Sequence, residues 1–108
     1  MKIELLYFEE GCPNWPAALR EMKEVLAEHG VDQPVELVAV ESIDDAQRLR
    51  FPGSPTLRVD GRDVELDPPT EGFSLECRIY WVGGRAAGVP PRDWMAHAVS
   101  SALAREAV

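Results

Sequence analysis

The chain has few cysteines and few basic residues. Two cysteines among 108 residues are too few for a disulfide framework or a four-thiolate zinc site. Nineteen acidic residues against 11 basic ones give a formal net charge of −8. This balance argues against nucleic acid and anionic membrane as partners, because both would repel the chain. The hydrophobic content of 45% argues against disorder, so a folded acidic domain with two thiols is left.

Long hydrophobic runs are also missing. No apolar stretch approaches the roughly 18 residues of a membrane span. The run Ile3–Phe8 is short and is followed by Glu9 and Glu10, which does not fit a secretory signal. We therefore expect a cytoplasmic protein whose thiols are reduced at rest. The length predicts one domain over residues 1–108.

The first third of the chain has the pattern strand, helix, strand. Residues 3–8 are almost continuously apolar, which predicts a strand buried on both faces. Apolar residues at helical spacing follow, among them Leu19 and Met22. Residues 35–40 form a second strand-like run. Strand, helix and strand in this order imply a right-handed crossover and a parallel strand pair.

Shorter elements are predicted next. Ser42 and Asp45 resemble a capping box that opens a short helix running to about Leu49. Residues 56–59 predict a short strand, and the turn signal Asp60-Gly61 closes it.

The last part of the chain predicts a strand and a helix. Residues 77–82 are expected to form the fourth strand of the sheet, ended by Gly83-Gly84, and Pro90-Pro91 precedes a final helix. The connection over residues 60–76 is acidic, and most such runs are solvated loops. A surface for a basic partner is the less favoured interpretation of it.

Three motifs coincide with this order of elements. Gly11-Cys12-Pro13-Asn14-Trp15 follows the first strand, Gly53-Ser54-Pro55-Thr56 opens the third, and Gly83-Gly84 ends the fourth. Over nearly its whole length the chain resembles the thioredoxin-like fold. More narrowly, it resembles small bacterial thioredoxin-like proteins with Gly-Cys-Pro-Asn, Gly-Ser-Pro-Thr and Cys-Arg-x-Tyr motifs, some of which carry an alkylmercury-lyase label. The resemblance implies an α/β domain of order βαβ-α-ββ-α, with a mixed sheet of about four strands flanked by helices.

The resemblance also implies a site. It places Cys12 at the redox position, with Pro13 and Asn14 on the loop before the first helix. It implies a cis peptide bond at Pro55 beside Cys12, where Ser54 would offer its backbone to an extended peptide or to glutathione. The alternative is that Pro55 only starts an edge strand.

The physical case for Cys12 has two sides. A thiol near a helix N-terminus is favoured as thiolate, whereas the charges of Glu9 and Glu10 oppose this if they lie nearby. Pro13 and Pro16 disfavour helical geometry just before them, so the helix is expected to begin nearer Pro16 and to leave Cys12 on a loop. The plain alternative is that Cys12 is a small buried apolar residue.

The second thiol is the main departure from dithiol thioredoxins. Their resolving cysteine follows the first by three residues, where this chain has Trp15. We expect Trp15 to pack over Cys12, and it is also a candidate for substrate contact. Cys77 is expected on a strand that begins at the opposite end of the sheet, far from Cys12. A Cys12–Cys77 disulfide with Cys77 as the resolving thiol is the less favoured alternative.

The leading hypothesis is thiol-based redox chemistry. Cys12 would carry monothiol thioredoxin- or glutaredoxin-like exchange with a thiol or disulfide substrate, either glutathione or a protein, without a cofactor. Turnover as an oxidoreductase and the oligomeric state stay open. A non-catalytic binding module, which Trp15 supports, and thiophilic metal or organomercurial handling by Cys12 and Cys77 are the alternatives. His29 and His97 lack partners at ligand spacing, so no resident metal is expected.

Overall fold

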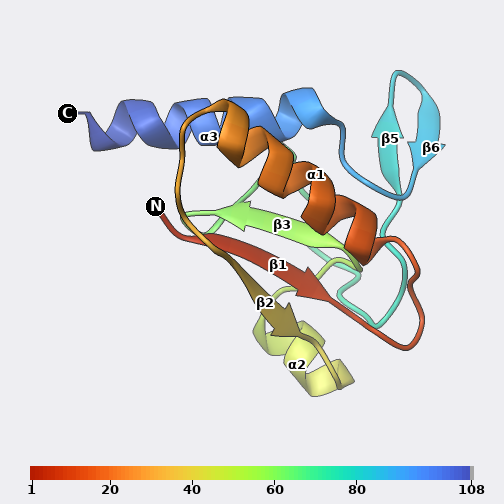
Figure 1. Cartoon of the computed structure of the whole chain (residues 1–108). Coiled ribbons are helices and arrows are strands. Elements are labelled where there is room, and N and C mark those ends of the chain that lie inside the picture. Colours follow the sequence, from red (N-terminus) through yellow and green to blue (C-terminus); the bar gives the residue numbers. More distant parts are fainter. Residues whose placement is uncertain (108) are drawn as a thin grey trace.

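A mixed sheet forms the centre of the molecule (Figure 1). The computed structural model describes residues 1–107. Strand β1 (Ile3–Tyr7) pairs in parallel with β2 (Val35–Ala39) and antiparallel with β3 (Thr56–Val59), and β3 pairs antiparallel with the short β4 (Arg62–Asp63). The strand order is therefore β2-β1-β3-β4. The predicted α/β class and the mixed four-stranded sheet are confirmed.

Helices cover both faces of this sheet (Figure 1). Helices α1 (Trp15–Glu28) and α3 (Arg92–Glu106) pack against each other on one face, and α2 (Ile43–Arg48) lies on the other. Within residues 1–107, none of the helices combines the length and the apolar character needed to cross a membrane.

The two faces of β1 explain why its sequence is almost continuously apolar. Ile3 and Leu5 are buried in the cluster that includes the inner sides of α1 and α3. Leu6 points to the opposite side and packs with Ala46 of α2 and with Phe51. Successive strand residues face opposite sides of a sheet, so a strand covered on both sides must be apolar at nearly every position.

Two local predictions about helix starts hold. The hydroxyl of Ser42 accepts a 3.0 Å hydrogen bond from the backbone N–H of Asp45, which caps α2 as the sequence predicts. Helix α1 begins at Trp15, with Pro16 in its first turn. Cys12 is consequently on the loop before the helix, outside the first turn where a helix dipole acts most strongly.

The prediction of a fourth sheet strand over residues 77–82 is wrong. Strand β5 (Tyr80–Val82) pairs with β6 (Arg85–Ala87) in a separate antiparallel hairpin, which stands beside the sheet domain (Figure 1). Gly83 and Gly84 form its turn, with φ values of +58° and +81°. A two-residue hairpin turn of type I′ needs positive φ at both central residues, which explains the glycine pair. The edge place in the sheet is taken by β4.

Candidate functional site

Cys12 lies where two loops meet at one end of the sheet. Because β1 and β3 are antiparallel neighbours, the last residues of β1 and the first residues of β3 lie at the same end of the sheet. The Cys12 side chain is buried, and its thiol donates a 3.1 Å hydrogen bond to the carbonyl oxygen of Ser54. The peptide bond between Ser54 and Pro55 is cis, as the resemblance implied. The two motif loops predicted to form a site are therefore in contact.

Cys77 is not far from Cys12, which corrects the sequence-based expectation. Its Sγ lies 3.3 Å from the carbonyl oxygen of Gly11, the residue next to Cys12. Cys77 also forms an isolated parallel bridge with Ser54. The physical reason is the connection after β4, which returns to the Cys12 end of the sheet before the β5–β6 hairpin starts. Cys77 therefore approaches the site from a connecting segment, not from a sheet strand.

The Cys12 side chain changes the titration of Cys77. The proximity of the Cys12 thiol, then burial, and then the charge of Cys12 raise the pKa of the Cys77 thiol to about 11. The Cys77 thiol is consequently protonated at neutral pH. Both cysteines are free, but Cys12 is buried and Cys77 is exposed. The pair thus has one inner and one outer sulfur.

The chain itself fills the backbone position that the resemblance assigns to a substrate. The N–H of Ser54 donates to the carbonyl of Glu76 at 2.8 Å, and the N–H of Arg78 donates to the carbonyl of Ser54 at 2.9 Å. Gly53 permits this approach, because a Cβ there would lie 2.9 Å from backbone atoms of Arg78. The expectation that Ser54 offers free backbone groups is therefore not met: residues 76–78 already use them.

A buried arginine fixes this segment. The Arg78 guanidinium lies 2.7 Å from Oδ2 of Asp63 and 2.7 Å from Oε1 of Glu65. It also donates to the Thr56 hydroxyl at 3.1 Å and lies over the ring of Tyr80, 4.4 Å from its centre. The acidic connection was expected to be solvated, and for Asp63 and Glu65 this is wrong because they neutralise a buried cation. The sequence signal that was missed is an arginine inside an otherwise apolar run.

Tyr80 adds a second anchor next to the site. Its hydroxyl donates to the carbonyl of Pro55, and its ring meets Trp94 edge-on at 6.2 Å between centres. Burial alternates along this segment: Arg78 and Tyr80 are buried, whereas Cys77 and Trp81 are exposed. Tyr80 and Trp81 therefore point to opposite sides, as neighbouring residues of a strand do. The Cys-Arg-x-Tyr motif thus holds its cysteine at the surface by burying its arginine and tyrosine.

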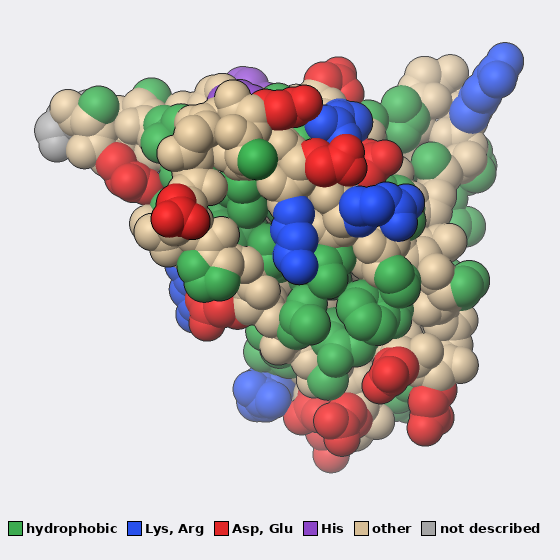
Figure 2. All heavy atoms as spheres, in the orientation of Figure 1, with side chains coloured by type: hydrophobic (Ala, Val, Ile, Leu, Met, Phe, Trp, Pro, Cys, Tyr) green, Lys and Arg blue, Asp and Glu red, His purple; other side chains and the backbone are tan. Residues whose placement is uncertain are grey.

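The remaining predicted site residues lie on the loop before α1 or at the start of this helix. The Trp15 ring lies 4.5 Å from the Tyr7 ring between centres, with the two planes tilted by 32°, so its aromatic contact is with β1. Figure 2 shows hydrophobic side chains gathered on the face where β1 ends and α1 begins. Pro13 is exposed. Asn14 is the N-cap residue of α1 but makes no side-chain capping bond, and its side chain packs against Gly88.

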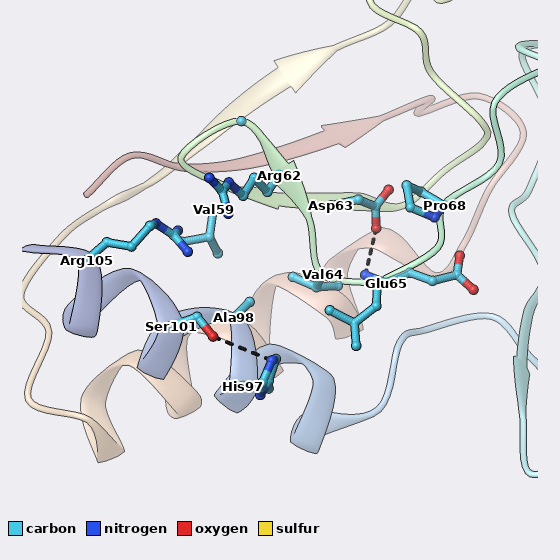
Figure 3. Close-up of a pocket in the computed structure, with 12 residues that line it drawn as sticks. Val59, Arg62, Asp63, Val64, Glu65, Pro68, His97, Ala98, Ser101 and Arg105 are labelled. Atoms are coloured by element: carbon cyan, nitrogen blue, oxygen red, sulfur yellow. Dashed lines mark hydrogen bonds between the residues drawn. The ribbon is translucent and has the colours of Figure 1, made fainter.

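A cavity of about 530 Å³ lies elsewhere, between α3 and the segment after β4 (Figure 3). Its polar lining includes Arg62, His97 and Arg105, and His97 lies 3.5 Å from the Ser101 hydroxyl. Neither cysteine lines this cavity, so we place the thiol chemistry outside it despite its size. Across residues 1–107, no group of three or more His, Cys, Asp and Glu side chains is arranged to hold a metal ion.

Three segments therefore meet at the thiol pair: the loop after β1, the loop before β3, and the segment before β5. Cys12 is held inside by Ser54, and Cys77 is held at the surface by its neighbours. Two adjacent thiols can form a reversible disulfide or bind a soft metal ion. No family model, curated protein or solved structure matches the chain.

Proposed function

We propose that the protein is a thiol-based redox protein of thioredoxin-like fold whose Cys12 and Cys77 cycle between dithiol and disulfide. The observation that carries this proposal is that both thiols contact the same two loops: Cys12 donates to the carbonyl oxygen of Ser54, and Cys77 forms a bridge with Ser54 and contacts the carbonyl oxygen of Gly11. The order of elements supports the fold: strand, helix, strand, helix, two strands and a final helix, with the β5–β6 hairpin inserted before that helix. The contact of Cys12 with Ser54 supports the site.

The Cys12–Cys77 pair supplies a resolving thiol although the chain has no Cys-x-x-Cys motif. Trp15 occupies the position of the usual resolving cysteine, so a resolving thiol has to come from elsewhere in the chain. Cys77 meets this need because it lies beside Cys12 and Gly11. When an external disulfide accepts two electrons from the pair, one protein disulfide and two external thiols result. The monothiol hypothesis thereby becomes a dithiol hypothesis.

Oxidation of the purified protein tests this proposal. Diamide treatment followed by intact-mass measurement under non-reducing conditions should show the loss of two hydrogens and of both alkylatable thiols. The Cys12→Ser and Cys77→Ser variants are matched controls, and neither can form the intramolecular bond. If the oxidised wild-type protein keeps two alkylatable thiols or forms only intermolecular disulfides, the proposal is wrong.

Binding of a soft metal ion is the second candidate function, and the convergence of the two thiols favours it. Two thiolates suit a soft, two-coordinate ion such as mercuric or cuprous ion. This function predicts one ion per chain and loss of tight binding in both Cys12→Ala and Cys77→Ala. Unchanged binding in Cys77→Ala would count against it. The non-catalytic binding module gains no comparable support, because residues 76–78 occupy the backbone of Ser54.

A further inference from the structure

The two sulfurs of the pair differ in access to solvent. Cys12 is 4% exposed and is covered by the loop of Ser54, to which its thiol donates. Cys77 is exposed, although its thiol contacts Gly11. Thiol exchange requires an attacking sulfur to reach the sulfur with which it forms a bond, so access decides which protein sulfur an outside molecule meets. That sulfur is the one of Cys77.

The neighbouring backbone restricts the size of the partner. An extended polypeptide that adds to a sheet edge or loop needs free N–H and C=O groups to pair with. The N–H and C=O of Ser54 are both bonded to residues 76–78. The Arg78 guanidinium, with its two carboxylate partners, holds that segment in place. A polypeptide therefore gains no backbone pairing with Ser54, and a small thiol needs none.

We infer that small external thiols exchange with this protein at the sulfur of Cys77, and that Cys12 is the inner sulfur released from the disulfide. The inference rests on the proposed dithiol cycle. It reverses the expected roles, in which Cys12 meets the substrate and Cys77 resolves.

The exchange balances in two steps. An external thiolate attacks Cys77 Sγ in the Cys12–Cys77 disulfide, a bond forms between the external sulfur and Cys77, and the electron pair leaves on Cys12. A second external thiolate attacks the external sulfur of this mixed disulfide, forms the external disulfide and displaces the sulfur of Cys77. The released protein thiolates regain their protons from water. Two external thiols are oxidised, and one protein disulfide is reduced.

Charge next to the exposed sulfur selects among small thiols. Glu76 precedes Cys77 in the chain, and Glu10 precedes Gly11, whose carbonyl contacts Cys77. Both carboxylates are exposed, and the chain carries a net charge of −8. Negative charge around a site repels anionic partners and attracts cationic ones. Cationic or uncharged thiols are therefore the preferred partners over anionic ones.

Peptide mapping tests the site of exchange. The oxidised wild-type protein is mixed with cysteamine, quenched in acid, and blocked with N-ethylmaleimide before trypsin digestion. Trypsin separates the two cysteines, since cleavage after Lys2, Arg20, Arg62 and Arg78 leaves Cys12 in residues 3–20 and Cys77 in residues 63–78. The expected cysteamine adduct is on residues 63–78. An adduct mainly on residues 3–20, or equally on both peptides, overturns the inference.

Two single variants decide the question when the mixed disulfide does not accumulate in the wild-type protein. Cystamine, the disulfide of cysteamine, should modify Cys77 in Cys12→Ser at least tenfold faster than it modifies Cys12 in Cys77→Ser. The opposite order overturns the inference. Failure of the wild-type protein to form any intramolecular disulfide is a different result, because it removes the proposed function itself.

The charge preference has its own matched control. At equal thiolate concentration and low salt, cysteamine should reduce the protein disulfide several-fold faster than 3-mercaptopropionate, and added salt should shrink the ratio. The double variant Glu10→Gln/Glu76→Gln should lose most of this ratio. The control Asp32→Asn/Glu36→Gln makes the same charge change near the start of β2, away from the thiols, and should retain the ratio. Equal rates for both thiols in the wild-type protein contradict the charge preference.

Discussion

The sheet domain and the segment that carries Cys77 are held together by different forces. The core between the sheet and helices α1 and α3 is apolar, with side chains such as Leu5, Leu57 and Met95 fully buried. The segment around Cys77 is fixed by one buried arginine and two carboxylates. Apolar burial has no direction, whereas charge-assisted hydrogen bonds fix position. We infer that the core stabilises the domain and that the arginine cluster places the outer thiol.

Leu57→Ala, in the apolar core, should have the largest effect on the free energy of unfolding. Leu57 is fully buried in β3, so its truncation should lower the free energy of unfolding by up to about 5 kcal/mol. Urea denaturation followed by circular dichroism measures this loss. Leu66→Ala is the matched control because Leu66 is 79% exposed, and it should change stability little. Similar losses in both variants would contradict the assignment of the core.

Arg78→Met should separate the two regions. It leaves Asp63 and Glu65 without their cation, which destabilises the segment around Cys77 by about 3 kcal/mol. The expected result is faster amide exchange over residues 73–80 and faster alkylation of Cys12, with unchanged exchange in β1 and α1. The exchange and alkylation rates of Arg78→Lys should fall between those of the wild-type protein and those of Arg78→Met. Lysine keeps the charge but cannot make both carboxylate contacts with the same geometry. Uniform loosening of the whole domain would show that the segment is not a separate unit.

Cys12→Ala should change the titration of Cys77. The nearby Cys12 side chain is the main cause of the raised pKa of the Cys77 thiol, which is about 11. Without it, the midpoint of Cys77 alkylation against pH should fall toward the ordinary value of about 8.5. The sign follows from the protonation state, since a raised pKa keeps the thiol protonated and unreactive at neutral pH. A midpoint that stays near 11 in the variant would remove Cys12 as the cause.

Ser42→Ala should have the smallest effect and leave the thiols unchanged. It removes the capping bond to Asp45 at the start of α2, for which the expected loss of stability is about 1 kcal/mol. The midpoint of urea denaturation should fall, while the alkylation rate of both cysteines under native conditions stays as in the wild-type protein. A change in thiol reactivity would show that α2 and the thiol site are coupled, contrary to the comparison above.

The sequence predicts the sheet domain well because periodic apolar burial leaves a periodic signal. The apolar run of β1, the start of α1 near Pro16 and the capped start of α2 at Ser42 were all identified correctly. The contact between the loops of Cys12 and Ser54 was implied by the resemblance alone, and the antiparallel pairing of β1 and β3 brings it about. These features depend on local pattern and on strand order.

The position of Cys77 could not be predicted in the same way. It depends on the partners that Arg78 finds 13 and 15 residues earlier in the chain, and side-chain pairs of this kind have no periodicity. In addition, the short β4 pairs with β3 at the edge of the sheet, and β5 pairs with β6 across the Gly83-Gly84 turn. Residues 77–82 are therefore not part of the sheet. A strand pattern was therefore recognised correctly for Tyr80–Val82, but it was assigned to the wrong sheet.

Equilibration with mixtures of reduced and oxidised dithiothreitol shows whether Cys12 and Cys77 form one reversible disulfide within the chain. At each mixture, acid quenching, thiol blocking and trypsin digestion measure the disulfide-linked pair of residues 3–20 and 63–78. We expect this linked pair to appear in a single two-electron transition as the mixture becomes oxidising. The two peptides remaining separate and fully blocked at every mixture would contradict it.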